Sequence, residues 1–69
     1  MGMKNKLREI RMREFLMNSG EFARMLGVNL KTYSNWEKNR SRPQLEEGLR
    51  IAKVLNRAVE DIWSLEDVE

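Results

Sequence analysis

Two short helical segments separated by only three residues constrain this fold more than any other feature of the sequence. The first helix is predicted over residues 19–26, because Asn18 is a favourable N-cap residue and Glu21 stands in the capping-box position. Gly27 follows directly, where the left-handed end of a helix prefers glycine. The second helix is predicted over residues 30–38. Because the connection is so short, the two helices must pack against each other.

The side chains of these segments meet the packing needs of a helix-turn-helix. Ala23 is small and lies where the second helix would cross the first closely. Tyr33 and Trp36 are three residues apart and form an apolar stripe that would hold the second helix against the core. Lys31 and Asn35 point away from that stripe. We therefore expect a second helix whose free face can enter the major groove of DNA.

The rest of the chain is predicted to complete an all-α fold, a compact bundle of five short helices. Helical spacing appears throughout, sustained alternation is absent and β-branched residues are few. A length of 69 residues allows one domain, with its core over about residues 4–64. The remaining helices are predicted over residues 4–14, 44–55 and 59–64, with Leu45, Leu49, Ala52 and Leu55 at helical spacing in the fourth. Residues 66–69 are expected to fray, and Met1-Gly2 is read with even weight as native or as a cloning remnant.

Composition removes most catalytic functions. The chain has no cysteine and no histidine, which excludes disulfides, zinc–thiolate sites and cysteine nucleophiles and removes the commonest general base. We expect no enzyme, metal site, cofactor or small-molecule substrate. No apolar run approaches the roughly 20 residues that span a bilayer, so no membrane association is expected. The lack of disulfides fits a cytoplasmic location.

Charge is divided unevenly along the chain. The net charge is only +2, but residues 24–42 hold five basic side chains and one acidic one. Residues 43–69 hold three basic side chains and seven acidic ones. This pattern favours one face suited to a polyanion and another kept away from it, although an uneven solvated surface would show the same pattern.

Taken in order, these segments resemble the phage repressor and Cro-type helix-turn-helix domains, also called the xenobiotic-response-element family. The matching segments are residues 7–11, 21–28, 33–39, 42–43 and 49–55, and the resemblance covers about residues 5–63. The sequence departs from the family pattern in a segment between Arg11 and Asn18 that is one residue longer than usual. It also has Ser19, Leu30 and Tyr33 where other residues are commoner. The resemblance implies a lambda-repressor-like fold and a homodimeric transcriptional repressor on a two-fold operator.

Residues on the free face of the second helix of the pair are predicted to read bases. Lysine can donate to guanine O6 and N7, and asparagine can pair with adenine N6 and N7. Leu30 either touches a thymine methyl group or folds back as a hydrophobic staple. The candidate base-reading residues are Leu30, Lys31, Ser34 and Asn35.

A second set of polar residues is predicted to bind the DNA backbone. The start of the helix at Ser19 offers amides and a favourable dipole, and the resemblance places a phosphate there. Cationic and amide side chains after residue 37 would bind the sugar-phosphate backbone and fix the position of the protein on the duplex, without distinguishing base sequences. Thr32 is included, although its hydroxyl, like that of Ser34, also suits a base contact or none. The candidate phosphate-binding residues are Ser19, Thr32, Lys38, Asn39, Arg40 and Arg42.

The resemblance also implies an ion pair and a dimer contact. It implies a largely buried ion pair between Arg11 and Glu37, with an exposed Glu37 as the alternative. It also implies a dimer contact through the fifth helix and the tail, with the alternative that Trp63 packs within its own chain over the first helix. The candidate dimer residues are Val59, Ile62, Trp63 and Leu65.

Two classes of partner therefore remain open. The first is double-stranded DNA, bound by a homodimer. The second is a protein partner, bound by a module of the same fold that acts as an antitoxin or co-regulator through the Trp63 end.

Overall fold

The computed structural model describes residues 2–65, and helices make up most of it. The elements in chain order are β1 (Met3–Asn5), α1 (Leu7–Ile10), η1 (Arg11–Phe15), α2 (Ser19–Leu26), α3 (Leu30–Glu37), α4 (Leu45–Val54), η2 (Val59–Asp61) and β2 (Trp63–Leu65). Within the described residues no helix is both long and apolar enough to cross a membrane. Met1 and residues 66–69, for which fraying was predicted, lie outside the described residues.

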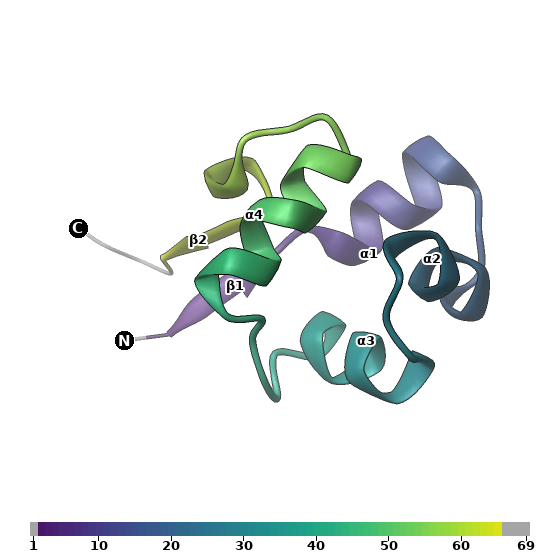
Figure 1. Ribbon diagram of the computed structural model, residues 1–69, viewed down its shortest axis with the longest axis horizontal. Coiled ribbons are helices and arrows are strands. Elements are labelled where there is room, and N and C mark those ends of the chain that lie inside the picture. The colour runs from purple at the N-terminus through teal and green to yellow at the C-terminus, as the bar shows by residue number, and fades with distance from the viewer. Residues whose placement is uncertain (1, 66–69) are drawn as a thin grey trace.

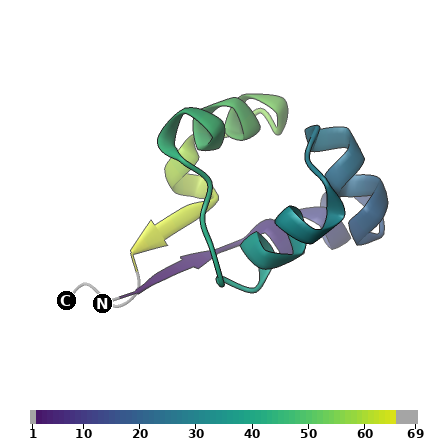
Figure 2. The ribbon, with the colours of Figure 1, turned by 60° about the horizontal axis from the view of Figure 1, so that its bottom comes forward.

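The prediction of a compact helical bundle is confirmed in part: the described residues are mostly helical, but they are not all-α and do not form five helices, because the two ends of the described chain form a β-ribbon. β1 and β2 pair antiparallel, with Met3 opposite Leu65 and Asn5 opposite Trp63. The Lys6 amide extends the pairing by donating to the Ile62 carbonyl oxygen at 2.9 Å. Figures 1 and 2 show the two strands side by side at one end of the molecule. The predicted fifth helix is reduced to the single 3₁₀ turn of η2.

The first predicted helix also differs from the structure. It begins at Leu7 rather than residue 4, since the residues before Lys6 belong to the ribbon. It then widens into the π-helical turn η1, which ends at Leu16 in the left-handed conformation with φ 53°. A π turn holds more residues than an α turn. It thereby accommodates the extra residue noticed between Arg11 and Asn18.

The core lies where α1, α2, α3, α4 and the ribbon meet. Phe22 is fully buried and contacts two other rings, the buried Tyr33 at 5.5 Å and the half-buried Phe15 at 5.4 Å between ring centroids. Tilted and edge-on contacts at this spacing are favourable. The largest fully buried side chains are Tyr33, Phe22, Leu7, Leu26, Ile51 and Ile62.

The core-facing side of α4 was predicted correctly at Ala52 and Leu55, which are buried, and wrongly at its two leucines nearer the start of the helix. Leu45 is 74% exposed and Leu49 is 51% exposed. Gly48 and Ile51 take their place beside Ala52 and Leu55, and these four buried residues are also at helical spacing. The ring of Trp63 packs over Gly48, where an added Cβ would lie 3.7 Å from it. Two leucines of α4 are consequently left on the surface.

Candidate nucleic-acid interface

Local side-chain caps define both helices of the helix-turn-helix, as predicted. At the start of α2, the Glu21 amide donates to Asn18 Oδ1 at 2.8 Å and the Asn18 amide donates to Glu21 Oε1 at 3.0 Å. α2 stops at Gly27, whose φ of 77° is the left-handed conformation expected there. At the start of α3, Asn29 Oδ1 accepts from the Thr32 amide at 2.8 Å. The chain therefore turns sharply and presents α3 across α2 (Figures 1 and 2).

α3 divides into a buried side and an accessible side. Tyr33 and Trp36 belong to the core, as expected. Leu30 and Lys31 are exposed in the first turn of the helix. Ser34 and Asn35 are half-buried. The four candidate base-reading residues thus retain accessible surface on one short helix.

The candidate phosphate-binding residues occupy the start of α2 and the two ends of α3. Ser19 is the first residue of α2 and Thr32 lies in the first turn of α3, and both are half-buried. After α3 the chain turns at Asn39, which has a φ of 63°. The Arg40 amide then donates back to the Asn35 carbonyl oxygen at 2.9 Å. Exposed side chains follow one another along this turn: Lys38, Asn39, Arg40, Ser41 and Arg42.

The ion pair between Arg11 and Glu37 is present. Arg11 Nε lies 3.0 Å from Glu37 Oε2, and the two side chains are only 12% and 14% exposed. Arg11 Nη1 also donates to the Met17 carbonyl oxygen at 3.0 Å, which ties η1 to the start of α2. The bridge therefore joins the N-terminal helices to the C-terminal end of α3.

Tyr33 is a third member of this cluster. The sequence pattern predicted only a core position for this residue. Its hydroxyl donates to Glu37 Oε2 at 2.6 Å. Burial raises the pKa of Tyr33 well above its usual value, and the hydrogen bond and charge of Glu37 raise it further. Burial lowers the pKa of Arg11, but the hydrogen bonds and charges of Glu37 and Tyr33 outweigh burial, so this pKa is raised overall. The spacing of four residues between Tyr33 and Glu37 was an available signal for this contact.

Asn5 was also missed. Its side-chain nitrogen donates to the Trp36 carbonyl oxygen at 3.0 Å and to Asn39 Oδ1 at 2.8 Å. Its side-chain oxygen accepts from the Leu7 amide at 3.0 Å. These contacts depend on the β-ribbon, so a prediction of helix from residue 4 gave no reason to expect them.

The four candidate dimer residues do not share one exposed face. Ile62 and Trp63 are 1% and 7% exposed and belong to the core of a single chain. Trp63 is buried within its own chain, and the neighbour of its ring is Gly48 of α4 rather than the first helix that the alternative named. Leu65 is 54% exposed and Val59 is half-buried. Only these two keep surface for a partner.

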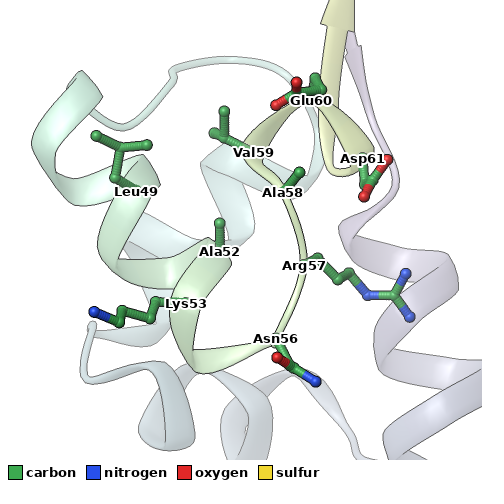
Figure 3. A pocket seen from close by; sticks show the side chains of 9 residues that line it. All are labelled: Leu49, Ala52, Lys53, Asn56, Arg57, Ala58, Val59, Glu60 and Asp61. Atoms are coloured by element: carbon green, nitrogen blue, oxygen red, sulfur yellow. The ribbon is translucent and has the colours of Figure 1, made fainter.

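Two hollows lie beside α4 at this end of the molecule. One, of about 540 Å³, lies between α4 and η2, where Figure 3 shows Leu49 and Val59 facing the same space while Arg57 points away toward α1 and η1. Arg57 is ion-paired with Glu14 of η1. The other hollow, of about 260 Å³, is mainly apolar and is lined by Met3, Arg42, Pro43, Gln44, Leu45, Gly48, Val59 and Trp63. In residues 2–65 no group of three or more acidic side chains is placed to hold a metal ion.

Comparison with known proteins identifies the same architecture. A family model described as helix-turn-helix matches residues 7–62. Two proteins of Archaeoglobus fulgidus, each described as an uncharacterized HTH-type transcriptional regulator, are 33% identical to this chain over 67 residues. The alignments cover 97% of this chain and 94% and 93% of the two relatives.

Proposed function

The chain belongs to the XRE-type helix-turn-helix family, the phage repressor and Cro-type family that its sequence resembles, and from that membership we propose that it regulates transcription by binding double-stranded DNA. We propose further that it acts as a repressor and binds a two-fold operator as a homodimer. The supporting observation is the accessible side of α3, which is held rigidly from behind by Tyr33 and Trp36 and continues into a cationic turn.

The proposed base contacts come from the exposed and half-buried side chains of α3. Lys31 is exposed and would donate to guanine, and the half-buried Asn35 side chain would pair with adenine. Leu30 is 51% exposed, which leaves its side chain available for a thymine methyl group. Ser34 adds a hydroxyl able to donate or accept.

The proposed backbone contacts surround those bases. The amides at the start of α2 and the hydroxyls of Ser19 and Thr32 would bind phosphates before the recognition helix. Lys38, Asn39, Arg40 and Arg42 would bind phosphates after it. Most of the affinity would then be sensitive to salt, because each neutralised phosphate releases counterions.

The proposed homodimer uses the surface beside α4. Leu45, Leu49 and Leu65 are each more than half exposed, and Val59 lies between the two hollows. Large contiguous apolar patches mark interaction surfaces, and we propose that these side chains form one. Ile62 and Trp63 would shape this surface from inside the chain. A two-fold dimer would present its two α3 helices to major grooves about 34 Å apart.

Selection from random duplex DNA, with sequencing of the bound pool, tests this function. An enriched inverted repeat is the expected result, and its spacing would report the dimer geometry. Salt-sensitive binding without enrichment would contradict the operator-specific regulator and leave an architectural role. Absence of binding at low salt would contradict the DNA function itself.

Matched variants then separate base reading from backbone binding. Lys31→Ala and Asn35→Ala are each expected to weaken the selected site by about 1–3 kcal/mol and random DNA much less. Arg42→Ala is expected to weaken both similarly and to lower the salt slope by about one unit. Equal losses on both DNAs for all three variants would contradict the division of roles.

The exposed leucines beside α4 also favour a second candidate, a protein-interaction module such as an antitoxin or co-regulator. Analytical ultracentrifugation of the chain with and without operator DNA distinguishes the two. A monomer that stays monomeric on DNA would leave this surface for a different protein. We propose no catalytic function, since the chain has neither histidine nor cysteine.

A further inference from the structure

We propose that Asn5 is a positioning residue for DNA backbone binding: it fixes the side-chain amide of Asn39 so that its NH₂ group faces a phosphate. This inference rests on the proposed function. It concerns a residue of the β-ribbon that is remote in sequence from the helix-turn-helix. Asn5 itself makes no contact with DNA in this proposal.

Three hydrogen bonds fix the orientation of the Asn5 side chain without ambiguity. The Trp36 carbonyl oxygen can only accept, so the atom of Asn5 that lies 3.0 Å from it must be the nitrogen. The Leu7 amide can only donate, so the atom 3.0 Å from it must be the oxygen. Both N–H groups of Asn5 are then used, one on Trp36 and one on Asn39.

The orientation of Asn39 follows from that of Asn5. A donor nitrogen 2.8 Å away requires Asn39 to present its oxygen toward Asn5. The NH₂ group of Asn39 is therefore turned away from Asn5. Phosphate oxygens are acceptors, so this is the half of the amide that a DNA backbone needs.

The setting of Asn39 suits a backbone contact. It is exposed, and it lies between the exposed cations Lys38 and Arg40. Its φ of 63° is a conformation that asparagine tolerates better than most residues. The backbone N–H of Asn39 also donates to the Trp36 carbonyl oxygen at 3.0 Å. The Asn5 side chain and the Asn39 backbone therefore share this acceptor in the last turn of α3.

The ribbon supplies the support for this arrangement. Asn5 is the last residue of β1 and stands opposite Trp63, whose ring is packed in the core. The Lys6 amide beside it is bonded to the Ile62 carbonyl oxygen. The ribbon therefore fixes the backbone of Asn5, while its side chain bonds to the C-terminal end of α3.

Asn5→Asp is the sharpest single test. The carboxylate keeps an acceptor for the Leu7 amide and nearly the same shape, but it cannot donate to Trp36 or Asn39. It would attract the NH₂ group of Asn39 and turn the oxygen of that amide outward. We expect binding to a random-sequence duplex to weaken about tenfold, the scale of one hydrogen bond to a charged group.

A double-mutant cycle separates this effect from the added negative charge and from stability. Asn39→Gly removes the side chain and suits the left-handed backbone, so it is the partner variant. In the Asn39→Gly background, Asn5→Asp should weaken DNA binding only through its added negative charge, and this loss of affinity should be clearly smaller than in the wild type. Thermal unfolding of all four proteins shows whether each is folded at the temperature of the binding assay.

A spectroscopic readout completes the test. In the wild type, the Asn39 side-chain NH₂ resonances should shift when random-sequence duplex is added, and in Asn5→Asp they should shift much less. An equal loss of affinity from Asn5→Asp in both backgrounds, or unchanged affinity, would overturn the positioning role. If wild-type protein binds no duplex at all, the proposed function fails instead, so the two failures are distinguishable.

Discussion

The two ends of α3 are held in different ways. At its N-terminal end the helix is capped locally, by Asn29 from the turn just before it. At its C-terminal end it is tied to distant parts of the chain, through Arg11 on Glu37 and Asn5 on the Trp36 carbonyl oxygen. The proposed base-reading residues begin at the locally held end.

As a result, the residues that position α3 in the fold differ from those that form its exposed surface. Long-range contacts at the C-terminal end fix where α3 lies relative to α1, η1 and the ribbon. The first turn carries exposed Leu30 and Lys31, which take no part in those contacts. Side chains there can therefore change without disturbing the contacts that place the helix, so the proposed sequence preference could vary independently of the fold.

Breaking the ion pair between Arg11 and Glu37 should have the largest effect on stability. Glu37→Ala leaves Arg11 largely buried without its carboxylate and leaves the Tyr33 hydroxyl without its acceptor. We expect a loss of about 3–5 kcal/mol in the free energy of unfolding, measured by urea denaturation. Glu37→Gln is the control and should cost less, because its amide oxygen still accepts. Equal stability of Glu37→Ala and wild type would contradict the anchoring role.

Removing the Tyr33 hydroxyl should have the next largest effect and should change the response to alkali. Tyr33→Phe is expected to cost about 1.5–3 kcal/mol at neutral pH, because it removes a hydrogen bond to a carboxylate. The folded pKa of Tyr33 is raised, so its protonated form contributes stability that is complete below the unfolded pKa of about 10. That contribution is lost as the pH rises toward the folded pKa.

Wild-type stability should therefore fall more steeply above pH 10 than that of Tyr33→Phe. Denaturation midpoints of both proteins through this range provide the measurement. Tyr33 is the only tyrosine in the chain, so ultraviolet absorbance reports its ionisation directly. Parallel curves for the two proteins would contradict a raised pKa.

The locally held end should be less sensitive. Asn29→Ala removes the cap on the Thr32 amide and should lower stability by about 1 kcal/mol. Asn29→Asp keeps an acceptor and serves as the control. A loss as large as that of Glu37→Ala would mean that both ends of α3 are equally important for its placement.

A smaller effect of opposite sign is expected at Leu16. α2 and α3 are followed by Gly27 and Asn39 in left-handed conformations, whereas η1 is followed by Leu16, which is 83% exposed. Leu16→Gly removes the steric cost of that conformation and loses little buried surface, so a gain of about 0.5–1 kcal/mol is expected. Thermal unfolding measures it, with Leu16→Ala as a control that retains the Cβ. A loss of stability would mean that the leucine makes a contribution beyond its few contacts.

Sequence reasoning succeeded where the signals are local. Asn18, Glu21, Gly27 and Asn29 specify both helices of the helix-turn-helix through caps and a stop, and each takes the role predicted for it. The pair Arg11–Glu37 was anticipated from the family pattern, and the structure contains it. The family assignment is confirmed, whereas the DNA-contact residues remain predictions.

The failures are long-range. Residues 3–5 and 63–65 are too short to show strand periodicity, and their pairing is set by three-dimensional proximity of the chain ends. Leu45 and Ile51 of α4 are similarly apolar, so spacing alone could not decide which one the core takes. Ile62 and Trp63 are buried in the single chain, and the sequence alone could not decide between a core position and a dimer contact for Trp63, because an apolar side chain suits both.

The β-ribbon has a consequence for how this molecule opens. Its pairs join residues from opposite ends of the described chain, so the loop closed by the ribbon is nearly as long as that chain, and closing it costs more entropy than closing a short loop, although this cost grows only slowly with length. Its strands are three residues each, so we expect their amides to exchange with solvent faster than those of α2 and α3. If the ribbon opened first, Asn5 would leave the end of α3, whereas the local caps of the helix-turn-helix do not depend on the ribbon. The grip on DNA would then loosen by partial opening at the chain ends, ahead of global unfolding.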